Sequence, residues 1–429
     1  MKILIVGSGG REHALAWALS KDQNVKEIYA APGNPGIVEL ATCVPINSTN
    51  TEELASFASK RAIDLTVIGP EAPLGAGIVD TFRKRSLAIF GPDKRAARIE
   101  TSKSFAKELC TRHHLPTPRW ETFTDKSRAI RALDELGPPW VIKADGLAAG
   151  KGTTVTIDRG EAESAIQHEL EREPKRIVME EFIDGWEASF TATVSADRVQ
   201  WLAPVFQDYK PAFDGDSGPN TGGMGVFSPV RLMTQSLVDR VRKKILDPAS
   251  AAISKEGSPF QGVLYLNVIV KHGTEDPYVL EFNARFGDPE AQGIMPIVTR
   301  GLFEHMSAVA ANSDSPPIPE LSHSASVVVV LASRGYPDNP STGELITLRP
   351  LTNSNIVVFH SGTARNSDGQ LVTSGGRVLS VAATGASIDS ARKDAYSVIG
   401  QSIQFPGMHY RSDIGSVQIR RRQLEPIKT

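Results

Sequence analysis

The chain has 429 residues, 40% of them hydrophobic, and its 47 lysines and arginines nearly balance its 49 aspartates and glutamates. A single hydrophobic core stops growing near about 250–300 residues, so roughly two to four domains are expected. The balanced charge argues against nucleic acid or an anionic membrane as the main partner. Small molecules are therefore the expected partners.

The chain has two cysteines, Cys43 and Cys110. They provide neither the count of a disulfide framework nor the CxxC spacing of a zinc site, which fits a reducing compartment. The first apolar run, residues 3–6, ends at a glycine and is too short for a signal peptide or a membrane span. We therefore expect a cytoplasmic location.

Short β-branched runs alternate with helical stretches over residues 1–100. Strands are predicted at 2–6, 27–31, 65–68 and 87–90, and helices at 12–20 and 51–62. A βαβ series of this kind predicts a parallel sheet. Each strand runs into a turn that contains glycine, and the ligand crevice of an open parallel sheet lies beyond those carboxyl ends. The turns are residues 7–10, 32–36, 69–77 and 91–93.

The first glycine turn resembles a dinucleotide-binding fingerprint but is incomplete. Glu12 stands where the third glycine is required, and the second strand supplies no acid for ribose hydroxyls. A nicotinamide dehydrogenase is therefore the weakest interpretation. The N–H groups of Gly9 and Gly10 at a helix start could instead face a phosphate, and a tight turn without a ligand is the alternative.

From residue 102 the pattern changes to α+β. A helix at 102–113 is stopped by the prolines of "LPTP", because a residue that precedes proline resists the helical conformation. Residues 206–229 have five glycines, three prolines and no periodicity, which predicts a long structureless loop that is either functional or disordered. The other predicted elements are strands at 140–144, 153–157, 176–180, 187–194, 325–333, 355–362 and 375–383, and helices at 160–173 and 388–400.

The stretch "KADGLAAGKG" at 143–152 is a glycine loop between two strands. It is not a Walker loop, because Gly152 stands where a magnesium-binding Ser or Thr is required and a strand follows. It can still close over a nucleotide as a flap, with Lys151 facing the phosphates. Lys143 shares a strand face with Val141, where a lysine is costly unless an anion pairs with it. A hairpin turn with a solvated lysine is the alternative for either feature alone.

Strands at 263–270 and 278–283 predict a hairpin. Alternation predicts one face with Val279, Glu281 and Asn283, and a core face with Tyr278, Leu280 and Phe282. The oxygens of Glu281 and Asn283 suit Mg²⁺ bound chiefly through substrate phosphates. An exposed polar strand face is the alternative, but Arg285 adds a fork for a carboxylate or phosphate and Gly287 permits close backbone approach.

The chain lacks a recognisable nucleophile, since its nine histidines are scattered and no GxSxG elbow occurs. Two glycine systems, several lysines, a candidate metal pair and an arginine remain. They favour phosphoryl transfer, in which positioning and charge neutralisation do most of the catalysis.

With these motifs in order, the sequence closely resembles the phosphoribosylamine–glycine ligase family of purine biosynthesis, within the ATP-grasp superfamily. The motifs that carry the resemblance are "GSGGREHALAW", "APGNPG", "GPEAPL", "KADGLAAGKG", "EEFIDGWEASF", "GPNTGGMG", "EFNARFGDPEAQ", "GYP" and "GGRVL". The resemblance implies a mixed α/β and α+β chain with a Rossmann-like, parallel-sheet N-terminal domain at 1–102 that binds phosphoribosylamine. It further implies a two-lobed ATP-grasp module at 103–324, with a flap subdomain at about 120–192, and a β-rich C-terminal domain at 325–429.

The resemblance also implies site residues. For ATP they are Lys103, Lys143, Gly150, Lys151, Gly152, Glu180, Glu181, Phe182, Ile183 and Glu187; for Mg²⁺ or Mn²⁺ they are Glu281 and Asn283. For the other substrates they are Gly9, Gly10, Arg11, Gly33, Asn34, Pro35, Gly69, Pro70, Glu71, Asp208, Lys210, Thr221, Gly222, Gly223, Met224, Gly225, Arg285, Gly287 and Asp288. Arg285, Asp288 and Lys143 are the expected catalytic residues, and a monomer is the expected state.

The expected reaction activates glycine's carboxyl with ATP as glycyl phosphate, which the amine of phosphoribosylamine then attacks. Three departures from the family border the expected site: Asp208-Tyr209-Lys210-Pro211 replaces "DHKR", Ala284 replaces a cysteine, and "YLNV" at 265–268 replaces "YAGL". The alternatives are another ATP-grasp ligase acting on a different carboxylate, and a nucleotide-binding module without turnover.

Overall fold

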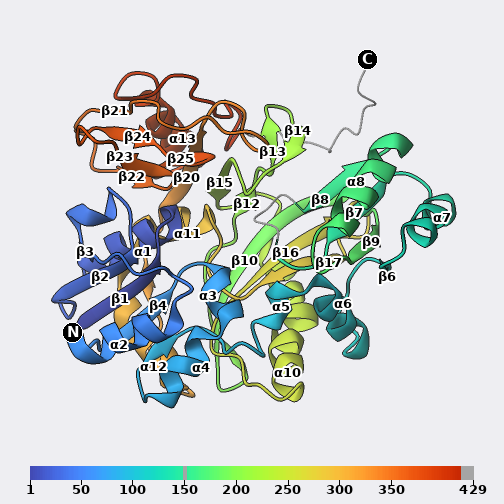
Figure 1. Ribbon diagram of the computed structural model, residues 1–429, viewed down its shortest axis with the longest axis horizontal. Coiled ribbons are helices and arrows are strands. Elements are labelled where there is room, and N and C mark those ends of the chain that lie inside the picture. The colour runs from blue at the N-terminus through green and yellow to red at the C-terminus, as the bar shows by residue number, and fades with distance from the viewer. Residues whose placement is uncertain (148–151, 417–429) are drawn as a thin grey trace.

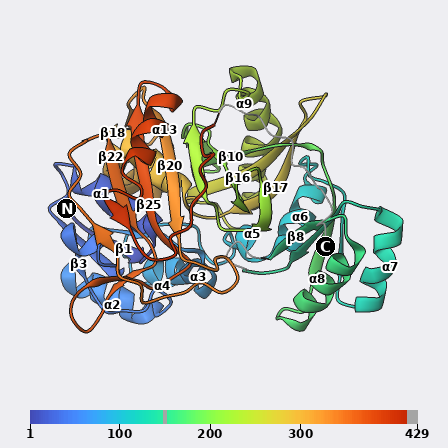
Figure 2. The same ribbon diagram turned by 90° about the horizontal axis from the view of Figure 1, so that it is seen from above.

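A computed structural model describes residues 1–147 and 152–416 of the chain (Figure 1). The N-terminal unit and the C-terminal sheet lie at one end of the molecule. Both views place α7 (Lys126–Leu136) and α8 (Arg159–Glu171) at the other end (Figures 1 and 2). Two antiparallel sheets connect these ends. Within the described residues, no helix is both long and apolar enough to cross a membrane.

The N-terminal sheet is fully parallel, as expected, with the strand order β3-β2-β1-β4-β5. Its central strand β1 is buried from Ile3 onward, as a strand covered on both faces must be. The elements are β1 Lys2–Gly7, α1 Gly10–Ser20, β2 Glu27–Pro32, a 3₁₀ turn Ile37–Glu39, β3 Thr42–Cys43, α2 Thr51–Arg61, β4 Leu65–Ile68, α3 Glu71–Ala76, α4 Ile78–Lys84 and β5 Ile89–Phe90.

The next sheet is antiparallel, with the order β6-β9-β7-β8, and β7 and β8 form the hairpin that carries the predicted flap. Gly150 and Lys151 of that flap lie outside the described residues. The elements are α5 Arg98–Thr101, α6 Lys103–Arg112, β6 Trp120–Phe123, α7 Lys126–Leu136, β7 Trp140–Ala144, β8 Thr153–Thr156, α8 Arg159–Glu171 and β9 Ile177–Glu181.

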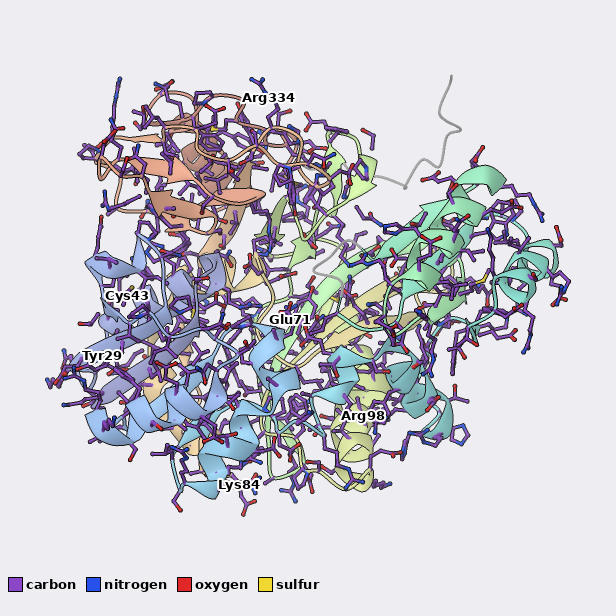
Figure 3. All side chains as sticks on the ribbon, viewed as in Figure 1. Tyr29, Cys43, Glu71, Lys84, Arg98 and Arg334 are labelled. Atoms are coloured by element: carbon purple, nitrogen blue, oxygen red, sulfur yellow. The ribbon has the colours of Figure 1, made fainter. Side chains whose placement is uncertain are left out.

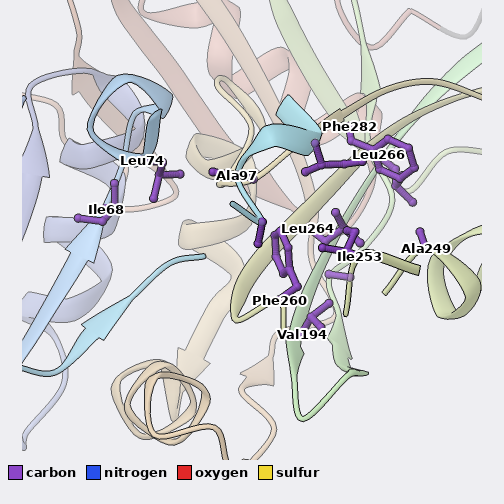
Figure 4. Close-up of a cluster of buried hydrophobic side chains, with 14 of the residues drawn as sticks. Ile68, Leu74, Ala97, Val194, Ala249, Ile253, Phe260, Leu264, Leu266 and Phe282 are labelled. Carbon is purple, nitrogen blue, oxygen red and sulfur yellow. The ribbon is translucent and has the colours of Figure 1, made fainter. Parts of the chain in front are cut away.

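A second antiparallel sheet follows, with the order β11-β10-β16-β17. Its elements are β10 Gly185–Ser195, β11 Arg198–Leu202, α9 Gln235–Val241, a π-helical turn Arg242–Leu246, α10 Asp247–Lys255, β16 Gly262–Lys271 and β17 Pro277–Asn283. Its apolar face joins the N-terminal unit in one hydrophobic cluster, in which Ile68 and Leu74 accompany Leu264 and Phe282 (Figure 4). The two units therefore share a core.

Strand β17 does not alternate as expected. Glu281 pairs with Asn267 of β16, but the next β16 residue pairs with Val279, so Leu280 is an extra residue in a β-bulge. The bulge turns Val279 into the core with Phe282, where they are 2% and 4% exposed. The prediction that Val279 shares a face with Glu281 is wrong. The prediction of Tyr278 and Leu280 as core is also wrong, because both are only half-buried.

The C-terminal sheet has the order β12-β15-β20-β25-β22, and α13 packs on it. Two of its strands come from residues 206–229, so the predicted structureless loop there is wrong: it holds β12, β13, β14 and β15. These strands have two to four residues and lack periodicity of their own, because they are formed by pairing with other segments. They are β12 Gln207–Asp208, β13 Pro211–Phe213, β14 Ser217–Asn220 and β15 Gly225–Ser228.

The remaining elements complete the C-terminal half. They are α11 Glu290–Ile294, a 3₁₀ turn Met295–Ile297, β18 Val298–Arg300, α12 Leu302–Ala310, β19 Glu320–Leu321, β20 Ala325–Ala332, β21 Thr347–Leu348, β22 Ile356–His360, β23 Thr363–Arg365, β24 Leu371–Thr373, β25 Arg377–Gly385, α13 Ile388–Ser397 and β26 Ile403–Gln404. The strands predicted at 325–333, 355–362 and 375–383 are confirmed.

Candidate active site

A cavity of about 430 Å³ is lined by residues of the N-terminal unit, both antiparallel sheets and the C-terminal sheet. Figure 3 shows Glu71, one of its wall residues, near the middle of the molecule, whereas Cys43 and Lys84 lie toward the periphery. The expected site residues in its wall are Arg11, Pro70, Glu71, Lys103, Lys143, Gly152, Glu180, Glu181, Phe182, Ile183, Glu187, Asp208, Lys210, Thr221, Gly222, Glu281, Asn283, Arg285, Gly287 and Asp288. Segments far apart in the sequence therefore meet here.

A second set of expected site residues does not line this cavity. Met224 is fully buried, and its N–H donates to the carbonyl of Tyr209, so it is a core residue. The others are Gly9, Gly10, Gly33, Asn34, Pro35, Gly69, Gly223 and Gly225. Two of them adjoin its wall, because a Cβ on Gly9 would lie 3.6 Å from Asp288 Oδ2 and one on Gly223 2.9 Å from Asp208 Oδ1.

The first glycine turn is occupied by a carboxylate of the chain itself. The N–H of Gly9 donates to Glu12 Oε2 at 2.5 Å, and Arg11 Nε donates to Glu12 Oε1 at 2.6 Å. Glu12 is 2% exposed. A helix N-terminus attracts negative charge, and here Glu12 supplies it. The N–H of Gly9 is thus not directed at a phosphate in this conformation.

The loop at 33–36 is held by the side chain of Asn34. Its Nδ2 donates to the carbonyl oxygens of Ser8 and His360, both at 2.8 Å, and its Oδ1 accepts from the N–H groups of Gly36 and Ile37. All of the side chain's principal hydrogen-bonding groups are used. Asn34 therefore joins the N-terminal loop to strand β22 of the C-terminal sheet.

Lys143 is buried and paired with an anion, as expected for a lysine on that strand face. Its Nζ lies 2.7 Å from Glu180 Oε1 and donates to the carbonyl of Leu280 at 3.0 Å. Lys107 lies 2.8 Å from Glu180 Oε2. Burial raises the pKa of Glu180, but the positive charges of Lys107 and Lys143 have a larger combined effect. The pKa is therefore lowered. Both oxygens of the Glu180 carboxylate thus pair with lysines. The backbone of this strand, not the carboxylate, is left to contact a nucleotide base.

Lys103 and Lys107 lie one turn apart on α6, and both line the cavity. Lys103 Nζ donates to the carbonyl of Gly146, just before the flap, at 3.2 Å. Burial lowers the pKa of Lys103. Our sequence analysis did not identify Lys107, although its spacing of four residues from Lys103 is a signal that both face the same side.

The predicted metal pair lies on the cavity wall beside a lysine. Lys210 Nζ is 3.7 Å from Glu281 Oε1. Burial would raise the pKa of Glu281, but Lys210, followed by Lys103 and Lys143, outweighs it, and the pKa is lowered. Glu281 is therefore an ionised carboxylate, and Asn283, two residues further along β17, lines the same cavity.

These residues fit a divalent ion that is bound partly by a substrate. Within the described residues, no group of three or more His, Cys, Asp or Glu side chains could hold a metal by itself. Mg²⁺ often keeps only one or two protein carboxylates and completes its shell with water and phosphate oxygens. The hard oxygens of Glu281 and Asn283 meet that requirement.

Arg285 is held by two carboxylates. Its NH2 lies 2.9 Å from Glu100 Oε1 and its Nε 3.4 Å from Glu71 Oε2. The second contact joins the loop after β17 to the start of α3. Burial would lower the pKa of Arg285, but Glu100 and Glu71 raise it. Sequence analysis missed Glu100, whose Oε2 also accepts from the N–H of Ala284 at 2.7 Å.

Arg377 of β25 is a third arginine in the cavity wall, beside Arg11 and Arg285, and it was not predicted from the sequence. Its NH1 donates to the carbonyl of Gly222 at 2.6 Å and to the carbonyl of Asp288 at 2.7 Å. Thr221 Oγ1 donates to the carbonyl of Lys210 at 2.7 Å. The loop at 221–225 is thus fixed from two sides. The signal for Arg377 was present in the motif "GGRVL", where an arginine follows two glycines.

Tyr265, Glu290 and Asp208 form an acidic group in the cavity wall. Tyr265 donates to Glu290 Oε1 at 2.8 Å, and Asp208 Oδ1 is buried with no hydrogen-bond partner within the described part of the chain. Burial and Glu290 raise the pKa of Asp208 well above its ordinary value. Tyr265 and Glu290 were not identified from the sequence. A cation bound beside Asp208 would offset the cost of burying the charged form of its carboxyl.

One of the three family departures, at residues 208–211, has a structural role. The Tyr209 ring lies under the guanidinium of Arg411, 4.7 Å from ring centre to Cζ, and Arg411 NH1 donates to the carbonyl of Pro211 at 3.0 Å. Arg411 is fully buried and pairs with Asp216 at 2.8 Å. Tyr209 therefore belongs to the C-terminal core.

Two antiparallel sheets around a cation-lined cavity, followed by a strand-rich unit, define the class as ATP-grasp. The biotin carboxylase domain of Hydrogenobacter thermophilus 2-oxoglutarate carboxylase shares this fold, with a TM-score of 0.73 at 15% identity over 95% of this chain and 91% of that one. The phosphoribosylglycinamide synthetase family matches in three parts: its N domain at 1–100, its ATP-grasp domain at 101–291 and its C domain at 326–417.

The chain belongs to the phosphoribosylglycinamide synthetase family. It is 44% identical over 428 residues to the phosphoribosylamine–glycine ligase of Ralstonia nicotianae, with 98% of this chain and 100% of that protein covered. It is also 44% identical over 442 residues to the enzyme of that name from Pseudomonas aeruginosa, with coverage of 99% and 100%. The crystal structure of the Thermotoga maritima phosphoribosylamine–glycine ligase matches with a TM-score of 0.82 at 34% identity over 96% of this chain and all of that one.

Proposed function

We propose that this protein is an ATP-dependent carbon–nitrogen ligase that joins glycine to 5-phosphoribosylamine, giving glycinamide ribonucleotide, ADP and phosphate in purine biosynthesis. Family membership supports the choice of substrates. The observation that carries the chemistry is that one cavity is lined by Lys103 and Lys143, by Glu281 and Asn283, and by Arg285. Phosphate, metal and acyl-group requirements are met at one place.

The nucleotide is assigned to the space between the two antiparallel sheets. The backbone of residues 180–183 would edge the adenine, and Glu187 would hold the ribose. Lys103 and Lys143 would neutralise phosphate charge, together with the flap residues Gly150, Lys151 and Gly152. Fixed cations placed where negative charge develops are usually the largest single contribution to transition-state stabilisation.

The metal is assigned to Glu281 and Asn283 as Mg²⁺ or Mn²⁺. When bound, the ion supplies Lewis-acid neutralisation of the phosphate oxygens. The chain's part is to keep Glu281 ionised, and the surrounding lysines lower its pKa accordingly.

The reaction has two steps. A glycine carboxylate oxygen attacks the γ-phosphorus of ATP. The bond between that phosphorus and the bridging oxygen of ADP breaks, and glycyl phosphate and ADP form. The amine of phosphoribosylamine then attacks the acyl carbon, phosphate leaves, and the nitrogen loses a proton. Arg285 and Asp288 are assigned to orient the acyl group, with Lys143 on the transferred phosphoryl group.

Phosphoribosylamine is assigned to the N-terminal side of the site. The residues proposed to hold it are Gly9, Gly10, Arg11, Gly33, Asn34, Pro35, Gly69, Pro70 and Glu71. Asp208, Lys210, Thr221–Gly225, Gly287 and Asp288 complete the acceptor region. Because Gly9 and Asn34 already have partners within the chain, this part of the proposal requires Glu12 or the 33–36 loop to move.

The proposed functional domains are residues 1–102, 103–324 and 325–429, and together they enclose one site. The proposed protein is a monomer in the cytoplasm. A coupled assay of the purified protein with glycine, fresh phosphoribosylamine, ATP and Mg²⁺ tests the proposed function. Phosphate release should require both glycine and phosphoribosylamine. ADP release of equal rate without glycine would contradict the assignment and indicate a ligase for another carboxylate. Absence of turnover with all substrates would indicate a binding module.

A further inference from the structure

The ammonium of Lys210 lies between two carboxylates that the proposed function assigns to different parts of the nucleotide. Its Nζ is 3.2 Å from Glu187 Oε2 and 3.7 Å from Glu281 Oε1. Glu187 is assigned to the ribose and Glu281 to the metal. One side-chain cation therefore joins the two assigned positions, and a nucleotide with its metal must compete with it at both.

The three groups are arranged as a bound cation and its ligands would be. The ammonium of Lys210 faces one oxygen of each carboxylate, and the side chains of Lys210, Glu187 and Glu281 are partly shielded from water, with exposed fractions of 26%, 28% and 35%. A positively charged group between two carboxylate oxygens is the arrangement that a bound cation would have.

The backbone of Lys210 is fixed, so its ammonium is a tethered ion. Its carbonyl accepts from the N–H of Thr221 at 2.9 Å and from Thr221 Oγ1 at 2.7 Å. Tyr209, the preceding residue, pairs with Gly225 and Met224 through backbone hydrogen bonds. A tethered group acts at a high effective concentration, on the order of millimolar or more, which a free ion must exceed.

Asn267 adds an oxygen to the same face of the sheet. It lies directly opposite Glu281 across the strands β16 and β17, and its Nδ2 donates to Glu187 Oε2 at 3.1 Å. Asn267 is 1% exposed, and its Oδ1 has no hydrogen-bond partner among the residues that the structure describes. A buried acceptor without a donor is costly and calls for a ligand. A cation is the ligand that suits an amide oxygen beside two carboxylates.

We propose that Glu187, Asn267 and Glu281 form a cation position, and that Lys210 occupies it until a metal–nucleotide complex displaces it. The inference rests on the proposed metal role of Glu281. Mg²⁺ sheds its water reluctantly and requires about six oxygens, which the protein alone does not supply here. The triphosphate supplies the missing oxygens and gives the released ammonium new anionic partners. Lys210 thus makes metal binding depend on nucleotide binding.

Electron paramagnetic resonance of Mn²⁺ tests the inference without turnover, and the comparison of variants needs no nucleotide. The Lys210→Met variant keeps most of the apolar stem but lacks the ammonium, and it should gain one Mn²⁺ site per chain, about tenfold tighter or more than that of the wild type. Lys210→Arg keeps the charge and should behave like the wild type. Adding Glu281→Gln to Lys210→Met should abolish the gained site.

Three results would overturn the inference: no gain in Mn²⁺ affinity for Lys210→Met, a gain that survives Glu281→Gln, or a wild-type protein that binds Mn²⁺ equally well with and without a nucleotide analogue. Thermal unfolding checks each variant, and Lys210→Gln replaces Lys210→Met if the latter does not fold. Ligase turnover of the wild type in the same preparation tests the proposed function separately. A failed assay with the Mn²⁺ gain intact contradicts that function and leaves this inference standing.

Discussion

Arg377 and Asp288 join the C-terminal sheet to the loop that follows β17. Arg377 NH2 lies 3.4 Å from Asp288 Oδ1, and its NH1 donates to the Asp288 carbonyl at 2.7 Å. The same NH1 donates to the carbonyl of Gly222. One guanidinium therefore fixes two loops that are distant in sequence and that both line the cavity.

Replacing Arg377 by lysine should impair turnover. Lysine keeps the charge but lacks the planar fork needed to bind a carboxylate and two carbonyls together, so kcat should fall by about tenfold or more. Steady-state kinetics measures this. Arg365→Lys is the matched control, because Arg365 is exposed and donates to the nearby Gly369 carbonyl at 2.8 Å. Equal losses in both variants would contradict the positioning role.

Glu281→Gln preserves the shape of the side chain and removes its charge. If Glu281 holds the metal, turnover should fall by about a hundredfold or more, because transition-state charge would lose its counter-ion. The phosphate-release assay at saturating Mg²⁺ measures the loss, and circular dichroism checks the fold. Glu275→Gln, in the turn between β16 and β17, should retain normal activity. Normal turnover of Glu281→Gln would refute the metal assignment.

The buried group of Lys107, Lys143 and Glu180 should be sensitive to loss of its acid. Glu180→Gln leaves two buried lysines without an anion, which should cost about 3–5 kcal/mol of unfolding free energy. Urea unfolding at pH 7 measures this cost. Glu181→Gln is the control, because Glu181 pairs at 2.8 Å with an arginine that is 84% exposed, and its loss should cost less than about 1 kcal/mol. Equal costs would contradict the argument from burial.

The same acid predicts a pH dependence. The pKa of Glu180 is lowered, so the folded chain binds this proton more weakly than the unfolded chain does. Its stabilising contribution is present above the ordinary pKa of 4.5 and declines as the pH falls below it toward the folded pKa. The stability difference between wild type and Glu180→Gln should therefore shrink on acidification below that pH. A constant difference from pH 7 to pH 3 would contradict this.

Two buried histidines at the junction of α1 and β22 should destabilise the fold in mild acid. Burial lowers the pKa of His13 to about 3 and that of His360 to about 4, from 6.5. Below pH 6.5 the unfolded chain takes up protons that the folded chain does not, so stability should fall as the pH falls, by about 1.4 kcal/mol per pH unit for each histidine.

Urea unfolding between pH 7 and pH 5 measures this slope. His13→Gln removes one titrating group and should flatten the slope, even if it also lowers stability at pH 7. His323→Gln changes an exposed histidine and should leave the slope as in the wild type. An unchanged slope in His13→Gln would show that His13 is protonated in the folded protein.

The sequence by itself determined the class, the family and most regular elements. Hydrophobic periodicity reports local burial, so it predicted the parallel N-terminal sheet, the hairpin of β16 and β17, and the need of Lys143 for an anion. The motif order identified the family, because glycine turns, the lysine-bearing flap and "EFN" follow one another in a specific sequence. These features depend on residues close together in the chain.

Only the tertiary structure decided which groups meet. The pairing of β7 with β9 brings Glu180 to Lys143 as its anion. The fold of the helix start brings the Glu12 carboxylate to the N–H of Gly9, which donates to it. The bulge at Leu280 and the strands within 206–229 depend on the registers of their partners. Periodicity carries no information about such contacts, because they are fixed by the packing of distant segments.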